Sequence, residues 1–157
     1  MSEPYLFSAL PDGITIGWKT STKPDNTEVI WGETEDQLNH SAEFGTTELS
    51  SSYFWNTSTL TGLQPDRIYY YKVKCNGHDS GIQRFRTLPQ NGHQGVVRFL
   101  IFGDHQRNLY SDYEWMLRMA ERKLNEKYGE KPIEEHVSFI MNMGDQVDQG
   151  TLKPYDE

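Results

Sequence analysis

The sequence predicts a mixed chain of two parts, an all-β sandwich followed by an α/β unit with strand–helix–strand order. Residues 4–88 hold short runs in which apolar and polar side chains alternate, separated by Gly, Pro, Asn and Asp turn residues. Residues 96–143 instead hold two apolar runs with a segment of helical period between them. We therefore place the sandwich at 1–89, a linker at 90–95 and the α/β unit at 96–157.

Strand patterns in the first part define faces that should meet in a core. Ile14, Ile16 and Trp18 share one face of a strand, and Val29 and Trp31 share a face of the next. A third run alternates at Tyr53, Trp55, Thr57 and Thr59. The aromatic side chains are expected in the core and on ordinary amphipathic surface, although exposed ones would offer a platform for carbohydrate or peptide.

Residues 60–73, Leu-Thr-Gly-Leu-Gln-Pro-Asp-Arg-Ile-Tyr-Tyr-Tyr-Lys-Val, form the most specific piece of the first part. This piece resembles the turn and penultimate strand of fibronectin type III domains, which are fibronectin/immunoglobulin-like sandwiches. The resemblance places Tyr69 where a hydroxyl bonds back to the backbone at a corner. Cys75 continues the alternation of this strand and is expected to be a core thiol. Asn76-Gly77 then suits a tight hairpin, because both residues tolerate positive φ.

One helix is expected between the two apolar runs of the second part. Ser111 and Glu114 match a Ser-x-x-Glu capping box. An apolar stripe recurs at helical spacing through Tyr113, Leu117, Ala120, Leu124 and Tyr128. Gly129 ends this helix, Pro132 prevents a restart, and residues 136–143 form the second strand.

Charges on the predicted helix lie mostly off the apolar stripe. Arg118 stands four residues after Glu114, and Glu126 stands near Arg122 and Lys123. Opposite charges at these spacings pair on a helix surface. We therefore expect a solvated face with ion pairs along this helix.

Two apolar runs that end in Gly-Asp carry the candidate site. Residues 98–104 read Arg-Phe-Leu-Ile-Phe-Gly-Asp, and residues 139–148 read Phe-Ile-Met-Asn-Met-Gly-Asp-Gln-Val-Asp. A buried strand that ends in a glycine turn delivers the next carboxylate to the rim of a sheet. Parallel strands joined by a right-handed crossover would place Asp104 and Asp145 side by side. Paired carboxylates suit Mn, Fe, Mg or Zn.

These two runs resemble the first two motifs of the calcineurin-like metallophosphoesterases. In that family the first strand ends in Gly-Asp-x-His or Gly-Asp-x-Gly, and the second in Gly-Asp-x-x-Asp, or Gly-Asp-x-x-Tyr among purple acid phosphatases. Gln106 stands here at the His or Gly position of the first motif, and a Gln oxygen is a weak ligand. Asp148 stands at the Asp or Tyr position of the second, which argues against an iron–tyrosinate bond.

The resemblance implies a site with two metal ions, chosen from Mn, Fe, Zn and Mg, that acts on a phosphoester substrate. The position matched by Asp145 bridges both metals, and the position matched by Asp104 binds one. Such a pair activates a water or hydroxide and clamps the phosphoryl oxygens for in-line attack. Asp148 would orient ligands or the turn. His105 would face the substrate or lie in a surface loop.

The family's later motifs, Gly-Asn-His, an isolated His and Gly-His-x-His, have no counterpart after Asp145. We therefore expect residues 96–157 to be a truncated start of a metallophosphoesterase domain, and residues 1–157 alone to be inactive. Two alternatives stay open. The chain is either a non-catalytic binding or structural module with a remnant βαβ unit, or it completes its site across an oligomer. The sandwich-first order matches plant-type purple acid phosphatases and bacterial relatives.

Composition excludes some partners. The net charge is −8 and no basic patch stands out, so binding of nucleic acid through its phosphates is not expected. No segment approaches transmembrane length. The first residues lack the pattern of a signal peptide, although the resemblance is compatible with a secreted or extracytoplasmic protein.

Overall fold

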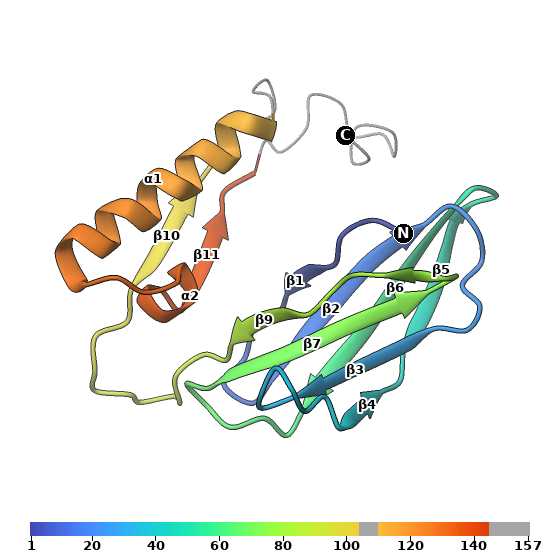
Figure 1. The fold of residues 1–157 in the computed structure, drawn as a ribbon, viewed down its shortest axis with the longest axis horizontal. Coiled ribbons are helices and arrows are strands. Elements are labelled where there is room, and N and C mark those ends of the chain that lie inside the picture. The colour runs from blue at the N-terminus through green and yellow to red at the C-terminus, as the bar shows by residue number, and fades with distance from the viewer. Residues whose placement is uncertain (104–109, 145–157) are drawn as a thin grey trace. The chain divides into compact units, whose positions relative to one another are not determined.

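The computed structural model describes residues 1–103 and 110–144 (Figure 1). The chain divides into two compact units, Met1–His93 and Gln94–Glu157. The first unit is built from strands alone among its regular elements, as the sequence predicts. The division falls within the linker predicted at 90–95, and the bounds of the two domains stay a prediction.

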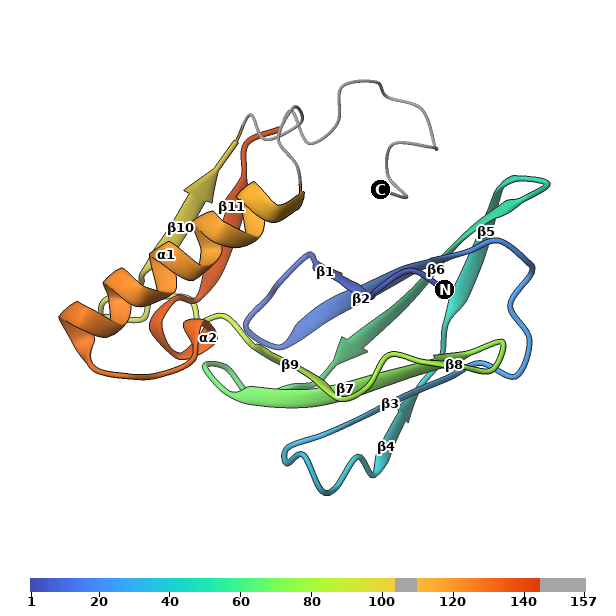
Figure 2. The same ribbon diagram turned by 45° about the horizontal axis from the view of Figure 1, so that its top comes forward.

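Two antiparallel sheets make up the first unit (Figure 2). The first sheet has the order β1-β2-β6-β5, with strands β1 (Tyr5–Phe7), β2 (Gly13–Thr20), β6 (Tyr53–Thr61) and β5 (Gly45–Ser50). The second has the order β4-β3-β7-β8, with β9 paired to β7. Its strands are β4 (His40–Ala42), β3 (Glu28–Gly32), β7 (Ile68–Cys75), β8 (His78–Asp79) and β9 (Gln83–Arg86).

The core lies between these sheets and follows the predicted faces of β2 and β7. Ile14, Ile16 and Trp18 of β2 are buried. On β7 every second side chain is buried, namely Tyr69, Tyr71, Val73 and Cys75. The alternation that predicts these strands therefore also identifies their inward faces.

Strand β6 buries the face opposite to the one that carries Tyr53 and Trp55. Its buried side chains are Phe54, Asn56, Ser58 and Leu60, whereas Trp55 and the threonines point to the other face. Asn56 is fully buried because its amide is satisfied. Its Oδ1 accepts from the Thr46 hydroxyl at 2.8 Å, and its Nδ2 donates to the Trp18 carbonyl at 3.3 Å.

Two local predictions in the sandwich are confirmed by their geometry. The backbone N–H of Gln64 donates to the Tyr69 hydroxyl at 2.8 Å, which is the corner bond expected at this position. Asn76 and Gly77 both have positive φ, 51° and 79°, and Cys75 pairs directly with His78 across them. The pair therefore forms the tight turn between β7 and β8.

In its described residues, 94–103 and 110–144, the second unit contains two strands and two helices. They follow the order β10 (Phe99–Phe102), α1 (Tyr110–Tyr128), α2 (Ile133–His136) and β11 (Phe139–Asn142). Strands β10 and β11 pair in parallel, with Phe99 opposite Phe139 and Phe102 opposite Asn142. Helix α1 lies along one face of this pair, where the Tyr113 and Phe102 rings meet edge to face at 5.8 Å (Figure 1). The assignment of this unit to a metallophosphoesterase domain stays a prediction.

Three sequence expectations about this unit are wrong. The two strands are not buried, because α1 covers one face and Ile101 on the other is 56% exposed. Helix α1 begins at Tyr110, so Ser111 lies inside it and does not precede it. A helical turn does restart after Pro132, since a proline before the first turn removes only an N–H that has no helical partner.

The predicted ion pairs along α1 are confirmed. Arg118 pairs with Glu114, and Glu126 pairs with Lys123 at 2.7 Å and with Arg122 at 3.7 Å. All of these side chains are well exposed, so each pair contributes little to stability. Within the described residues no helix is long and apolar enough to cross a membrane.

Candidate functional site

The carboxyl ends of β10 and β11 lie side by side at one edge of the parallel pair. Phe102 is opposite Asn142 in the register, and the Met143 N–H donates to the Phe102 carbonyl at 2.8 Å. The next residue of β10 is Gly103, where a Cβ would stand 3.4 Å from that of Met143. Both Gly-Asp runs therefore leave the sheet at the same edge, which is where ligand sites of parallel sheets are found.

The turn that follows β11 depends on a glycine. Gly144 has a φ of 109°, a backbone conformation that side-chain-bearing residues rarely adopt. Its N–H donates to Oδ1 of Asn142 at 3.1 Å. This bond closes a short turn of the Asx kind directly before position 145. The strand and its glycine thus fix the direction in which the chain leaves the sheet.

The predicted ligands themselves lie outside the described residues. This holds for Asp104, His105, Gln106, Asp145 and Asp148. Over 1–103 and 110–144 no group of three or more His, Cys, Asp and Glu side chains is placed to hold a metal ion. The structure places Gly103 and Gly144, which directly precede Asp104 and Asp145, at the same edge of the sheet. The roles of the five residues stay predictions.

A polar network fixes the start of β11 against α1. Oδ1 of Asn125 lies 2.6 Å from Nε2 of the buried His136 and accepts from the Lys131 N–H at 3.0 Å. Because the Lys131 donor identifies this atom as the acceptor, Nε2 of His136 is the protonated nitrogen. Oε1 of Glu121 also accepts from the Ile133 N–H at 3.1 Å and so satisfies the first turn of α2.

The beginning of β10 is held to the same end of α1. The guanidinium of Arg98 lies over the Tyr128 ring at 4.2 Å, and the Arg98 carbonyl accepts from the Ser138 N–H at 2.8 Å. Hydrogen bonds from Arg98 and then Lys127 lower the pKa of the Tyr128 hydroxyl. Sequence reasoning missed the roles of Asn125 and Arg98, because their contacts with His136 and Tyr128 form only when the helices and strands of this unit pack together.

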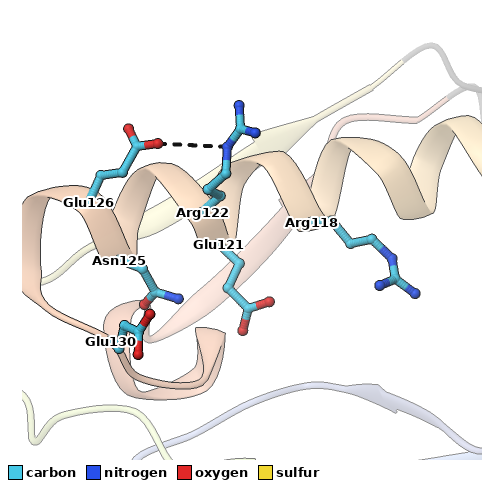
Figure 3. A pocket seen from close by; sticks show the side chains of 6 residues that line it. All are labelled: Arg118, Glu121, Arg122, Asn125, Glu126 and Glu130. Carbon is cyan, nitrogen blue, oxygen red and sulfur yellow. Dashed lines mark ion pairs between the residues drawn. The ribbon is translucent and has the colours of Figure 1, made fainter.

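A surface hollow of about 340 Å³ lies on α1, away from the sheet edge that carries Gly103 and Gly144 (Figure 3). It is lined by Arg118, Glu121, Arg122, Asn125, Glu126 and Glu130. Arg122 is paired with Glu126 one turn along the helix at 3.7 Å, as the dashed line in Figure 3 shows. Two arginines face three glutamates, so the charges offset and the hollow is not suited to a strongly anionic ligand. It fits the solvated helix face that the sequence predicts.

Comparison with known families identifies the sandwich. The family model described as "Purple acid Phosphatase, N-terminal domain" matches residues 6–87, more than half of the chain. The chain belongs to this family. The predicted relationship to purple acid phosphatases is therefore confirmed, and it rests on the sandwich. The purple acid phosphatase N-terminal domain match ends before the Gly-Asp runs.

Solved structures give two further likenesses. The purple acid phosphatase PPD1 from yellow lupin (Lupinus luteus) seeds is 25% identical with a TM-score of 0.52, and covers 68% of this chain. A structure named PhoD is 17% identical with a TM-score of 0.57, covers 92% of this chain and shows a shared fold. This chain spans only 22% and 28% of those two proteins. A search of curated proteins gave no match.

Proposed function

We propose that this chain forms the N-terminal portion of a metal-dependent phosphoric ester hydrolase. Asp104 and Asp145 would bind the metals. The observation that carries the proposal is the parallel pairing of β10 and β11, which brings Gly103 and Gly144 to one edge of the sheet. Family membership of the sandwich supports a phosphatase origin independently, because it rests on residues 6–87 alone.

The residues at this edge fit a metal site by their chemistry. Each run offers a carboxylate directly after a glycine, and the positive φ of Gly144 turns the chain sharply at that point. Carboxylate oxygens suit Mg, Mn, Fe and Zn, and a metal pair would supply the activated water and the electrostatic clamp on the phosphoryl group. Gln106 would be a weak further ligand. Asp148 would orient the others, and His105 would face the substrate.

The open face of the β10–β11 pair also supports a larger α/β domain. Phe99, Ile101 and Met141 are exposed on the face that α1 does not cover. Parallel sheets are normally covered on both faces, and a two-stranded pair is marginally stable by itself. Under the proposal, further structure of the hydrolase covers this face.

A non-catalytic binding or structural module with a βαβ unit is the second candidate. One observation favours it, since the family match covers the sandwich and stops at residue 87. The two candidates differ in whether the natural gene product hydrolyses phosphoesters with metal bound at the carboxylates of the sheet edge.

Metal content and phosphatase activity of the natural gene product test the proposal. We expect Asp145→Asn to reduce bound metal and to lower hydrolysis of p-nitrophenyl phosphate and bis-p-nitrophenyl phosphate by about 100-fold or more. Asp104→Asn should do the same. Asp36→Asn is the matched control, because this exposed aspartate lies in the sandwich.

Retention of full metal content and activity in both Asp104→Asn and Asp145→Asn would contradict the proposal. Bound metal without hydrolysis of either ester would favour the binding module. Size-exclusion runs with and without chelator address the remaining alternative, because a site completed across an oligomer predicts dimers that need metal.

A further inference from the structure

Three aromatic rings lie together on the outer face of the β1-β2-β6-β5 sheet. The Tyr5 and Trp55 centroids are 6.3 Å apart with planes at 41°, and those of Phe7 and Trp55 are 6.2 Å apart at 30°. These separations exceed the 4.9 Å of the stacked pair Phe99–Phe139. The rings therefore lie beside one another, with the Tyr5 and Phe7 planes tilted relative to that of Trp55. We call Tyr5, Phe7 and Trp55 the aromatic platform.

A glycine beneath the rings makes this arrangement possible. Gly17 of β2 pairs with Tyr5 in the register, and a Cβ on it would stand 2.5 Å from the Trp55 indole and 2.8 Å from the Phe7 ring. The missing side chain lets the indole lie against the backbone of β2. Tyr5 and Phe7 remain 50% and 38% exposed, although they lie on an edge strand. Proteins usually keep large apolar side chains off such edges, and exposed apolar patches often mark binding sites.

Threonine hydroxyls continue the same face beside the platform. Thr15 is opposite Phe7 on one side and Thr59 on the other, and Thr57 is opposite Gly17. The Oγ1 atoms of Thr15 and Thr59 share one hydrogen bond of 3.2 Å. A pair of hydroxyls that shares one bond keeps one O–H to donate and lone pairs to accept.

Charge is nearly absent from this face. On β2 the strand registers place one charged side chain, that of Lys19, on this face. Lys19 is only 8% exposed, and its Nζ lies 5.6 Å from the centroid of the Tyr53 ring. Carboxylates, by contrast, outnumber cations over the whole chain, with 23 Asp and Glu against 15 Lys and Arg. A surface of ring faces and hydroxyls without accessible charge suits a neutral, polyhydroxylated ligand better than an ionic one.

We propose that the aromatic platform binds a neutral polysaccharide. The apolar C–H faces of successive pyranose rings would lie on Tyr5, Phe7 and Trp55, and sugar hydroxyls would bond to Thr15 and Thr59. This function is separate from the proposed hydrolase site, because every residue involved belongs to the sandwich. It would hold the protein on a glycan surface.

Depletion of the full chain from solution by insoluble polysaccharide tests the proposal. The probes are microcrystalline cellulose, chitin and insoluble starch. We expect binding to at least one of them, with an affinity that Tyr5→Ala and Phe7→Ala each lower by about 2- to 10-fold. Ile82→Ala, which removes a similarly exposed apolar side chain between β8 and β9, should bind like the unmodified chain.

Trp55 is not the first position to change, because its indole covers Gly17 and its loss can unfold the sheet. Near-ultraviolet circular dichroism checks that each variant keeps its fold. Absence of binding to all three polysaccharides overturns the proposal, and so does equal weakening by Ile82→Ala. Sedimentation velocity supplies a further contrary outcome. A dimer that Tyr5→Ala dissociates would show that a second copy of the chain covers the platform.

Discussion

Tyr71 is the residue at which burial most clearly alters ionisation in the sandwich. Its side chain is almost fully buried on β7, where the centroid of its ring lies 6.0 Å from that of the Phe85 ring. Burial raises the pKa of Tyr71 from 10.0 to about 12, with a smaller contribution from the negative charge of Glu3. Both effects oppose formation of the phenolate, since one removes water and the other places like charge nearby.

This pKa makes stability depend on pH in the alkaline range. The folded protein holds the Tyr71 proton more tightly than the unfolded chain, so the stabilisation is fully present below pH 10 and is lost as pH rises to about 12. A shift of this size corresponds to about 2–3 kcal/mol in the free energy of unfolding. Urea titrations at pH 8 to 12 should show that Tyr71→Phe flattens this loss.

Tyr70→Phe is the matched control, because Tyr70 lies on the outward face of the same strand. Its pH dependence should follow that of the unmodified protein. Parallel curves for the unmodified protein and Tyr71→Phe would contradict the assignment to Tyr71.

At the scale of elements, the junction of α1, α2 and β11 depends on one amide. Asn125→Ala removes the acceptor of both the Lys131 N–H and Nε2 of buried His136. An unsatisfied buried donor costs about 1–3 kcal/mol. We expect faster hydrogen exchange at the Lys131 amide and through α2, with exchange in the sandwich unchanged.

Glu126→Ala provides the control on the same helix. It removes only exposed ion pairs with Arg122 and Lys123, which should alter stability by less than about 1 kcal/mol. Equal acceleration of exchange in both variants would contradict the role given to the hydrogen bonds of Asn125, because both variants place Ala, the best helix former, on α1.

A strand and its buried face could be predicted from the sequence where apolar and polar side chains alternate regularly. Strand β7 alternates from Tyr69 to Cys75 with a buried side chain at every second position, so period and face agree. Strand β6 misleads, because Trp55 lies on the outer face while polar Asn56 is buried. Nothing near Asn56 in the sequence reveals the Thr46 and Trp18 groups that satisfy it, since both come from other strands.

The candidate site, too, was predictable from the sequence only in part. Two apolar runs ending in Gly-Asp, with a helix between them, are enough to predict parallel strands whose ends meet, and the pairing of Phe102 with Asn142 agrees. The contacts that hold this edge were not predictable. Arg98 meets Tyr128, and Asn125 meets His136, only because α1 folds back along the strands.

For the whole molecule, the exposed face of β10 and β11 distinguishes the proposed hydrolase from a self-sufficient module. Ile101 is 56% exposed on this face. In the 157-residue chain, Ile101→Asp should therefore change the free energy of unfolding by less than about 1 kcal/mol. In a larger α/β domain the same side chain would be covered, and an unpaired buried carboxylate would cost several kcal/mol, about 3–5.

Thermal unfolding of the 157-residue chain and of the natural gene product, each with and without Ile101→Asp, measures this difference. Ile82→Asp is the control, because Ile82 lies in the sandwich at 39% exposure and should behave alike in the chain and in the natural gene product. A large drop in melting temperature confined to Ile101→Asp in the gene product would show that further structure packs on this sheet. Equal small effects in both forms would mean that the face stays open. The carboxylates at its edge would then lack the dry surroundings that make a metal pair effective, and the binding module would be the better description.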